Sequence, residues 1–218
     1  MMRSLVIPLF LLSWLASAQE KPEPTVLFLY PADVIIPQSI KPELTVYDKE
    51  IEITTEIRNS YVTPGLSPNW KTIRENELEF VKRQNFATLL VIGLSRELTY
   101  RAVQHFDNIL IYPLKKSLEP NKVTYKILAE QYSMSWLVNV HKIELSRTGS
   151  TNQLTVSVEL YNPNPDWVFV DSTYTVDDTA LDAAACEEGI WYCLSEKLKI
   201  TIIDDLEDKI QKNRHHHK

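Results

Sequence analysis

Glycine is scarce in this chain, with only four glycines among 218 residues. Tight loops that bring backbone amides onto a phosphate depend on glycine, so the familiar nucleotide-binding loops are not expected. The sequence also lacks the Gly-x-Ser-x-Gly elbow of many hydrolases and the His-Glu-x-x-His pair of zinc peptidases. These absences argue against nucleotide binding and against motif-based catalysis.

Positive charge is also in short supply. The chain has 23 Lys and Arg residues against 29 Asp and Glu residues, which gives a formal net charge of −6. Nucleic acids and anionic lipid surfaces attract proteins through a cationic footprint. An acidic, well-mixed surface of this kind is typical of a folded protein that does not bind nucleic acid.

The chain has only two cysteines, Cys186 and Cys193. On a regular helix their spacing corresponds to roughly 10 Å of rise, whereas a disulfide needs Cα atoms within about 7 Å. Because the surrounding pattern predicts a helix, we expect two unpaired, largely buried thiols. A helix interrupted at Gly189 would instead favour a local structural disulfide, which export would permit.

An apolar run near the start, Leu5–Leu15, follows Arg3 and precedes the small residues Ala16-Ser17-Ala18. This order is typical of a secretory signal peptide over residues 1–18, with cleavage between Ala18 and Gln19. The run is short for a bilayer span, so an N-terminal membrane anchor is the less favoured alternative. We therefore expect an exported protein, periplasmic or secreted, with no membrane span in its mature form and an exposed leader over residues 19–24.

Apolar runs and periodic patterns predict alternating strands and helices. Buried strands are expected at 25–30 and 108–113, and helices at 67–105 (divided at Asn85), at 120–132 and from Thr179 onward. Residues 135–178 read as three strands joined by short polar turns, and the middle one alternates apolar and polar residues. Residues 32–66 show both strand-like and helix-like spacing and are left open, with a small preference for strand.

This order predicts a single α/β domain of α+β-like character over residues 25–211, with 32–70 as an uncertain insertion. Its mixed sheet should end in a three-stranded antiparallel meander, with helices packed mainly on one face and a long C-terminal helix. Residues 212–218 are expected to form a disordered tail.

Candidate chemical groups are few. His105 is expected to end a helix and His141 to lie on a strand in register with Asn139 and Ile143, both in structural or surface roles. The terminal run His215–His217 makes a poor metal site because it has no evident supporting shell. The neighbouring acidic residues point in different directions and predict caps or solvated helix faces: Asp177-Asp178, Glu187-Glu188 and Asp204-Asp205. No catalytic, cofactor-binding or metal-binding residue is assigned.

The turn between the second and third strands of the meander is more suggestive. Aromatic side chains flank its polar residues, a composition that favours contact with another protein or a sugar. Core packing is the commoner role of such aromatics, but a partner-binding site is a second hypothesis here. Its residues would be Tyr161, Asn162, Asn164, Asp166 and Trp167.

From about Thr25 to Leu206 the chain resembles the group formed by the TolB amino-terminal domain, the curli-secretion lipoprotein CsgG and the penicillin-binding-protein activator LpoB. The resemblance lies in the strand 26–31, the helix 86–106 leading to the strand 108–113, the helix and strand within 127–140, and the hairpin 154–178. Residues 132–135 lack the glycine usual in that group, and 32–70 have no counterpart. The resemblance implies an exported adaptor or assembly module without catalytic residues.

The expected function is therefore that of a periplasmic protein-binding or envelope-assembly adaptor, without enzyme activity or cofactor, whose partner is another envelope protein. A homo-oligomer is compatible with the sequence. The alternative is an exported hydrolase acting on glycan or peptide, whose carboxylates would converge only in three dimensions.

Overall fold

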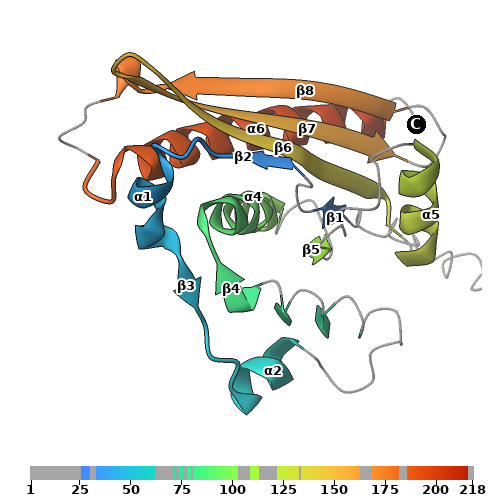
Figure 1. The fold of residues 1–218 in the computed structure, drawn as a ribbon. Coiled ribbons are helices and arrows are strands. Elements are labelled where there is room, and N and C mark those ends of the chain that lie inside the picture. Colours follow the sequence, from blue (N-terminus) through green and yellow to red (C-terminus); the bar gives the residue numbers. More distant parts are fainter. Residues whose placement is uncertain are drawn as a thin grey trace, which may run out of the picture.

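The computed structural model describes residues 26–29, 33–61, 71, 74–75, 78–79, 81–102, 109–112, 122–132, 134–162, 168–181 and 186–215. Within these ranges the chain forms one main mixed sheet with helices on both of its faces, as Figure 1 shows. The predicted cleavage site at Ala18 and Gln19 lies outside the described residues.

The main sheet has the strand order β5-β1-β6-β7-β8, with β2 paired to β6 beside β1. The short strands β1 (Val26–Leu29), β2 (Asp33–Ile35) and β5 (Ile109–Tyr112) are parallel to their neighbours. The long strands β6 (Trp136–Thr148), β7 (Thr151–Asn162) and β8 (Val168–Asp177) form an antiparallel meander. The predicted mixed sheet ending in a meander is confirmed.

Two helices cover one face of this sheet (Figure 1). They are α4 (Phe86–Ala102) and the long C-terminal helix α6 (Ile190–His215). A third helix, α5 (Lys122–Tyr132), packs on the opposite face near the start of β6. The helices therefore lie mainly on one face, as the sequence predicts.

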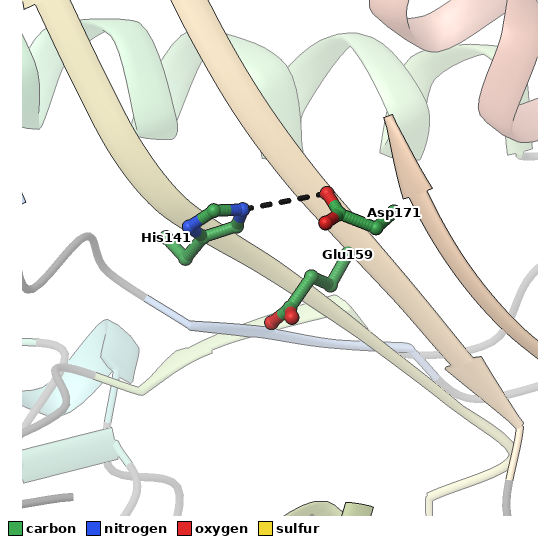
Figure 2. Close-up of side chains that lie close together, drawn as sticks. All are labelled: His141, Glu159 and Asp171. Carbon is green, nitrogen blue, oxygen red and sulfur yellow. Dashed lines mark ion pairs between the residues drawn. The ribbon is translucent and has the colours of Figure 1, made fainter. Parts of the chain in front are cut away.

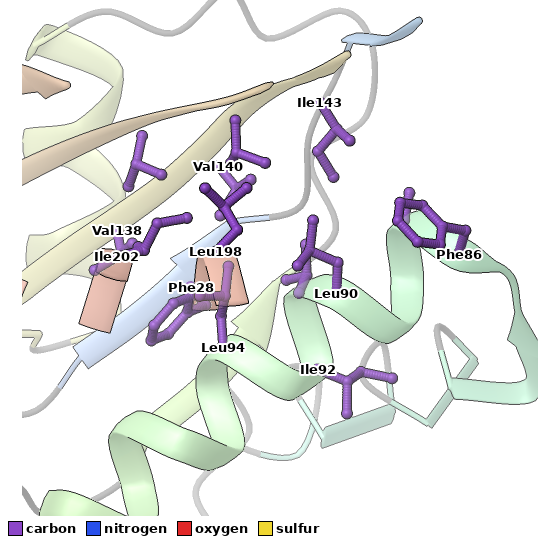
Figure 3. Close-up of a cluster of buried hydrophobic side chains, with 14 of the residues drawn as sticks. Phe28, Phe86, Leu90, Ile92, Leu94, Val138, Val140, Ile143, Leu198 and Ile202 are labelled. Carbon is purple, nitrogen blue, oxygen red and sulfur yellow. The ribbon is translucent and has the colours of Figure 1, made fainter. Parts of the chain in front are cut away.

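The main core lies between the sheet and the pair α4 and α6. Figure 3 shows Phe28 of β1 and Val138 of β6 facing Leu94 of α4, with Leu198 of α6 close by. These side chains are essentially inaccessible to solvent. On β7, Leu154, Val156, Val158 and Leu160 all contribute to this core, which accounts for the alternation seen in the sequence.

A smaller core lies under α5. It consists of Leu27 and Leu29 of β1, Leu137 of β6, Tyr161 of β7, and Tyr125, Leu128, Ala129 and Met134 from α5 and the residues that follow it. Burial of β1 on both faces explains its uninterrupted apolar sequence, because each face packs against a helix layer.

The predicted division at Asn85 is confirmed. Residues 71, 74–75, 78–79 and 81–82 are helical, β4 (Arg83–Gln84) follows, and α4 then begins at Phe86. The Asn85 side chain accepts a hydrogen bond from the Thr88 amide at 3.0 Å, so Asn85 caps α4 in the usual manner of asparagine.

Residues 33–61, which the sequence left open, form a series of short elements. After β2 come α1 (Lys41–Leu44), the 3₁₀ turn η1 (Thr45–Tyr47), β3 (Lys49–Glu50) and α2 (Thr55–Tyr61). Strand β3 pairs with β4 in a separate two-stranded ladder away from the main sheet (Figure 1). More of this stretch is helical than extended, so the small preference for strand is wrong.

The start of the C-terminal helix differs from the prediction. Residues 178–180 form the 3₁₀ turn η2 (Asp178–Ala180), capped by Asp177, and α6 begins only at Ile190. Gly189, immediately before it, has φ of 97°, a conformation that favours glycine. The helix continues to His215, so the predicted tail at 212–218 is wrong for residues 212–215.

The late start of α6 also corrects the prediction of unpaired thiols. Cys186 lies outside the helix and Cys193 in its first turn, with Cα atoms 5.9 Å apart and a disulfide between them. The estimate of 10 Å assumed a continuous helix across both residues, whereas the chain reverses at Gly189. The structure therefore has the alternative named above, a helix interrupted at Gly189 and a local disulfide.

Among the described residues, no helix combines the length and the apolar character needed to cross a membrane.

Candidate functional site on the open face of the sheet

The sheet face opposite α4 and α6 is polar along the meander. It carries Lys142 and Glu144 of β6, Thr155 and Ser157 of β7, and Thr173 and Thr175 of β8, and we call these six residues and the surface around them the open face. Across β7 and β8, hydroxyl groups face each other at 3.1 Å in the pairs Thr155–Thr175 and Ser157–Thr173. Lys142 and Glu144 form an ion pair at 2.7 Å.

A β-bulge at His141 changes what this face displays. The pairing of β6 with β7 shifts between Val140 and Lys142, which leaves His141 as the extra residue. Val140 and Ile143 both lie in the main core, so His141 and Lys142 fall between them toward the other face. The predicted register of His141 with Ile143 is therefore wrong, because a bulge interrupts strict alternation.

Next to the bulge, three potential ligand residues converge at the end of the open face near α5. Asn139 of β6 pairs with Glu159 of β7, and Glu159 pairs in turn with Asp171 of β8. His141 Nε2 lies 3.5 Å from Asp171 Oδ1. One ligand atom from each of His141, Glu159 and Asp171 lies within 4.8 Å of the other two. Figure 2 shows this arrangement, which we call the His–Glu–Asp cluster.

Glu159 is the most buried member of the cluster, at 8% exposure. The Tyr125 hydroxyl of α5 donates a hydrogen bond to its carboxylate, and Asn139 Nδ2 donates to the same oxygen at 2.9 Å. The Asn139 amide also donates to the Tyr125 hydroxyl at 2.6 Å. Burial, together with the Glu159 carboxylate, raises the pKa of Tyr125, so the phenol stays protonated and remains a donor.

The remaining polar atoms of the cluster are less well satisfied. Asn139 is 1% exposed, yet its Oδ1 has no hydrogen-bond partner among the described residues. His141 Nε2 also lacks a hydrogen bond there, although it lies beside Asp171. Asp171 is the exposed member, with 56% of its side-chain surface accessible, so the cluster opens toward solvent on that side.

A second feature of the meander is its outer edge. Strand β8 spans ten residues and pairs with β7, and no second strand pairs with it among the described residues. It contains no proline and no basic residue, and its exposed side chains include Asp171, Thr173 and Thr175. A long edge strand without proline or lysine is open to pairing with another chain.

Three hollows lie elsewhere on the described surface, away from the His–Glu–Asp cluster. One of about 510 Å³ lies between α2 and the helical residues before β4, and its charged lining consists of Arg58, Glu75, Glu79 and Lys82. Arg58 and Glu75 in this lining are 3.8 Å apart and form an ion pair. Two smaller hollows adjoin α4. The members of the His–Glu–Asp cluster line none of these three hollows in the described part of the chain.

The predicted partner-binding residues have mixed outcomes. Tyr161 is 2% exposed and packs against Tyr125, with ring centroids 5.8 Å apart, so its prediction as a contact residue is wrong. Its ring fills the small core under α5. Asn162 ends β7 and is partly exposed, and its role stays a prediction. Asn164, Asp166 and Trp167 lie outside the described residues, as does His105.

Glu159 and Asp171 were not identified from the sequence. The only available indication was the alternation of β7, which assigns Thr155, Ser157, Glu159 and Tyr161 to one face. Their convergence with His141 depends on how β6 pairs with β7 around the bulge and on the register across the turn after Asn162. A single sequence indicates neither of these.

No family model matches the chain, and no curated protein matches its sequence.

Proposed function

We propose that this protein is an exported, non-enzymatic binding protein that takes up an extended segment of an envelope protein along the edge of β8. The observation that carries this proposal is the ten-residue edge strand without a second strand partner among the described residues. Strand addition to such an edge supplies affinity through main-chain hydrogen bonds and specificity through alternate side chains.

The charge of the edge defines the partner segment. Asp171 and Asp177 lie on β8, no lysine or arginine does, and the whole chain has a net charge of −6. An extended segment with basic side chains matches this edge, since charge complementarity steers association and suppresses wrong partners. The exposed Thr173 and Thr175 would lie beside its alternate residues.

Two further observations support the export that this function requires. The first 18 residues have the pattern of a signal peptide. The Cys186–Cys193 disulfide is the kind of bond that persists in an oxidising compartment such as the periplasm. The predicted resemblance to TolB-like envelope proteins points the same way, since that group consists largely of proteins that bind other proteins.

The test is recovery of a partner from an envelope extract by three immobilised forms of the protein. Thr173→Lys/Thr175→Lys places two lysines on the edge strand, where they oppose both strand addition and a basic partner. Thr155→Lys, the control, places one lysine on the same face but on the inner strand β7. We expect the β8 variant to recover at least tenfold less partner, while the Thr155 variant recovers as much as wild type.

Hydrogen exchange then locates the contact. Binding by strand addition should slow amide exchange along β8 when the recovered partner is added back. Equal recovery by the wild type and the β8 variant would contradict the proposal. Loss of recovery in Trp167→Ala with an intact edge would instead assign the contact to the turn between β7 and β8.

The convergence of Glu159 and Asp171 beside His141 favours a second candidate, an exported hydrolase acting on glycan or peptide. Such chemistry needs two carboxylates across a substrate cleft, whereas the cluster lines none of the hollows described above. We therefore prefer the binding function. Turnover of envelope glycan or peptide by the wild type, and its loss in Glu159→Gln, would reverse that preference.

A further inference from the structure

We infer that the His–Glu–Asp cluster is a binding site for a divalent transition metal of the zinc type. His141 Nε2, a Glu159 carboxylate oxygen and Asp171 Oδ1 would be its protein ligands. Each comes from a different strand of the meander, so the sheet itself holds the ligand set in place. This site is independent of the proposed strand addition, although Asp171 lies on the same strand.

The distances allow a metal ion to bind after a small closing movement of the ligands. The three ligand atoms lie within 4.8 Å of one another. Zinc bonds of about 2.0–2.2 Å require ligand atoms to approach within roughly 4 Å of each other. Asp171 is exposed enough to rotate over the remaining distance, and His141 is partly exposed beside it. Only side-chain rotation is therefore needed.

The charges of the cluster call for a cation. Glu159 and Asp171 stand directly opposite each other on antiparallel strands, and like charges in that position destabilise a sheet. Among the described residues no lysine or arginine pairs with either of them. The two groups that donate hydrogen bonds to Glu159 are the Tyr125 hydroxyl and the Asn139 amide, and both are neutral. A divalent ion between the carboxylates would remove the repulsion and compensate the buried charge of Glu159.

A separate observation is the unpaired oxygen of Asn139. Its side chain is buried beside Glu159, yet Oδ1 has no partner among the described residues. Buried acceptors are normally satisfied, so an unpaired one points to a water or an ion as its partner. A water bound to the metal would supply the donor that this oxygen lacks.

The surroundings resemble those of known metal ligands in one more respect. Ligating carboxylates are usually held by outer hydrogen bonds that fix their orientation. Tyr125 and Asn139 do this for Glu159, and Tyr125 is itself fixed in the small core under α5. One imidazole and two carboxylates suit Zn²⁺ and its first-row neighbours better than Ca²⁺, which prefers ligand sets made only of oxygen. Three protein ligands also leave a position for water on the exposed side.

The test must first remove a competing site. Three histidines near the C-terminus, His215, His216 and His217, would bind zinc in solution whatever the cluster does. The full chain with all three changed to Gln is therefore the starting protein, freed of metal by chelation. Zn²⁺ is then titrated by calorimetry, Co²⁺ by its visible absorption, and Ca²⁺ serves as the comparison ion.

We expect one equivalent of Zn²⁺ or Co²⁺ to bind and to raise the Tm, with much weaker binding of Ca²⁺. In this background, His141→Gln, Asp171→Asn and Glu159→Gln should each weaken zinc binding at least tenfold. Tyr125→Phe should weaken it about tenfold by freeing Glu159. Glu144→Gln, on the same face but outside the cluster, should bind as the background does. Circular dichroism confirms that each variant folds.

Absence of zinc heat, Co²⁺ absorption and a Tm change in the starting protein would overturn the inference. Retention of full zinc affinity in the His141→Gln/Asp171→Asn double variant would also overturn it, because the ion would then bind elsewhere. If Glu144→Gln lost as much zinc affinity as Asp171→Asn, the ion would be responding only to the overall negative charge of the open face. That result would also overturn the inference.

Discussion

Asn139 and Glu159 lie directly opposite each other on β6 and β7, and the Asn139 amide donates to the Glu159 carboxylate at 2.9 Å. Both residues are at least nine-tenths buried in a sheet whose other face is packed with aliphatic side chains. This pair, completed by Tyr125 from α5, connects the small core to the open face. It is the polar centre around which His141 and Asp171 are arranged.

Tyr125→Phe should destabilise the fold by about 1–3 kcal/mol, because it leaves the buried Glu159 carboxylate with one donor fewer. Urea unfolding in the presence of chelator measures this loss without any metal contribution. A double-mutant cycle with Glu159→Gln separates the interaction free energy between Tyr125 and Glu159 from the other effects of losing the hydroxyl. Additive effects of the two substitutions would contradict the contact.

Leu198→Ala should cost about 2–5 kcal/mol, since Leu198 is fully buried between α6 and the sheet. Ile200→Ala, two residues further along the same helix, is the matched control. Ile200 is 51% exposed, so its loss should change the free energy of unfolding by less than about 0.5 kcal/mol. Equal effects of the two substitutions would contradict the orientation of α6 on the sheet.

The Cys186–Cys193 bond should stabilise the oxidised protein by about 2–3 kcal/mol, because it closes a short loop in the unfolded chain. Thiol titration of the unfolded, unreduced protein should find no free thiol. The double variant Cys186→Ser/Cys193→Ser should unfold at lower urea concentration, by the same margin as the reduced wild type. Two titratable thiols in the oxidised preparation would contradict the disulfide.

The sequence predicted the large elements well, because burial on a sheet face or a helix face imposes a period that can be counted. The alternation in Leu154–Leu160 led directly to β7 and to its core face. Asn85 was predicted to divide one long helix into two, and its side chain, which suits a cap better than a helix interior, caps α4 in the structure. Such local preferences depend on a few neighbouring residues.

The candidate site could not be predicted in the same way. Strict alternation places His141 on the face of Asn139, but the residues of β7 that lie beside it depend on the pairing register, and nothing local in Val140-His141-Lys142 indicates the bulge that shifts this register. Asp171 reaches His141 and Glu159 through the register of a third strand. The disulfide was missed for a related reason, since one glycine with positive φ ended a helix that periodicity alone would continue. The bulge and the two strand registers are decided by tertiary pairing.

A charged network at the other end of the meander should make the fold sensitive to acid. Arg147, at the end of β6, donates to both oxygens of Glu43 of α1, at 2.8 and 2.7 Å. The indole of Trp191 in α6 donates to Glu43 at 3.0 Å. The bond with Arg147, more than the opposing effect of burial, lowers the pKa of Glu43 below its ordinary value of 4.5.

A carboxyl group whose pKa is lower in the folded than in the unfolded state stabilises the fold above its unfolded pKa, and that stabilisation disappears as pH falls through the folded value. Glu43→Gln keeps an acceptor for Trp191 but removes the charge that Arg147 pairs with. We expect it to cost about 1 kcal/mol at pH 7, the modest size typical of a partly exposed pair. The cost should shrink steadily as pH falls below 4.5.

Urea unfolding of wild type and Glu43→Gln at a series of pH values from 7 to about 3 measures this difference. Glu130→Gln, at an exposed position of α5, is the matched control and should keep the free energy of unfolding close to that of wild type at pH 7. If the difference in free energy of unfolding between wild type and Glu43→Gln stayed constant across the whole pH series, Glu43 would contribute only through its shape and its hydrogen bonds. The charge of its pair with Arg147 would then play no part in joining α1 to the meander.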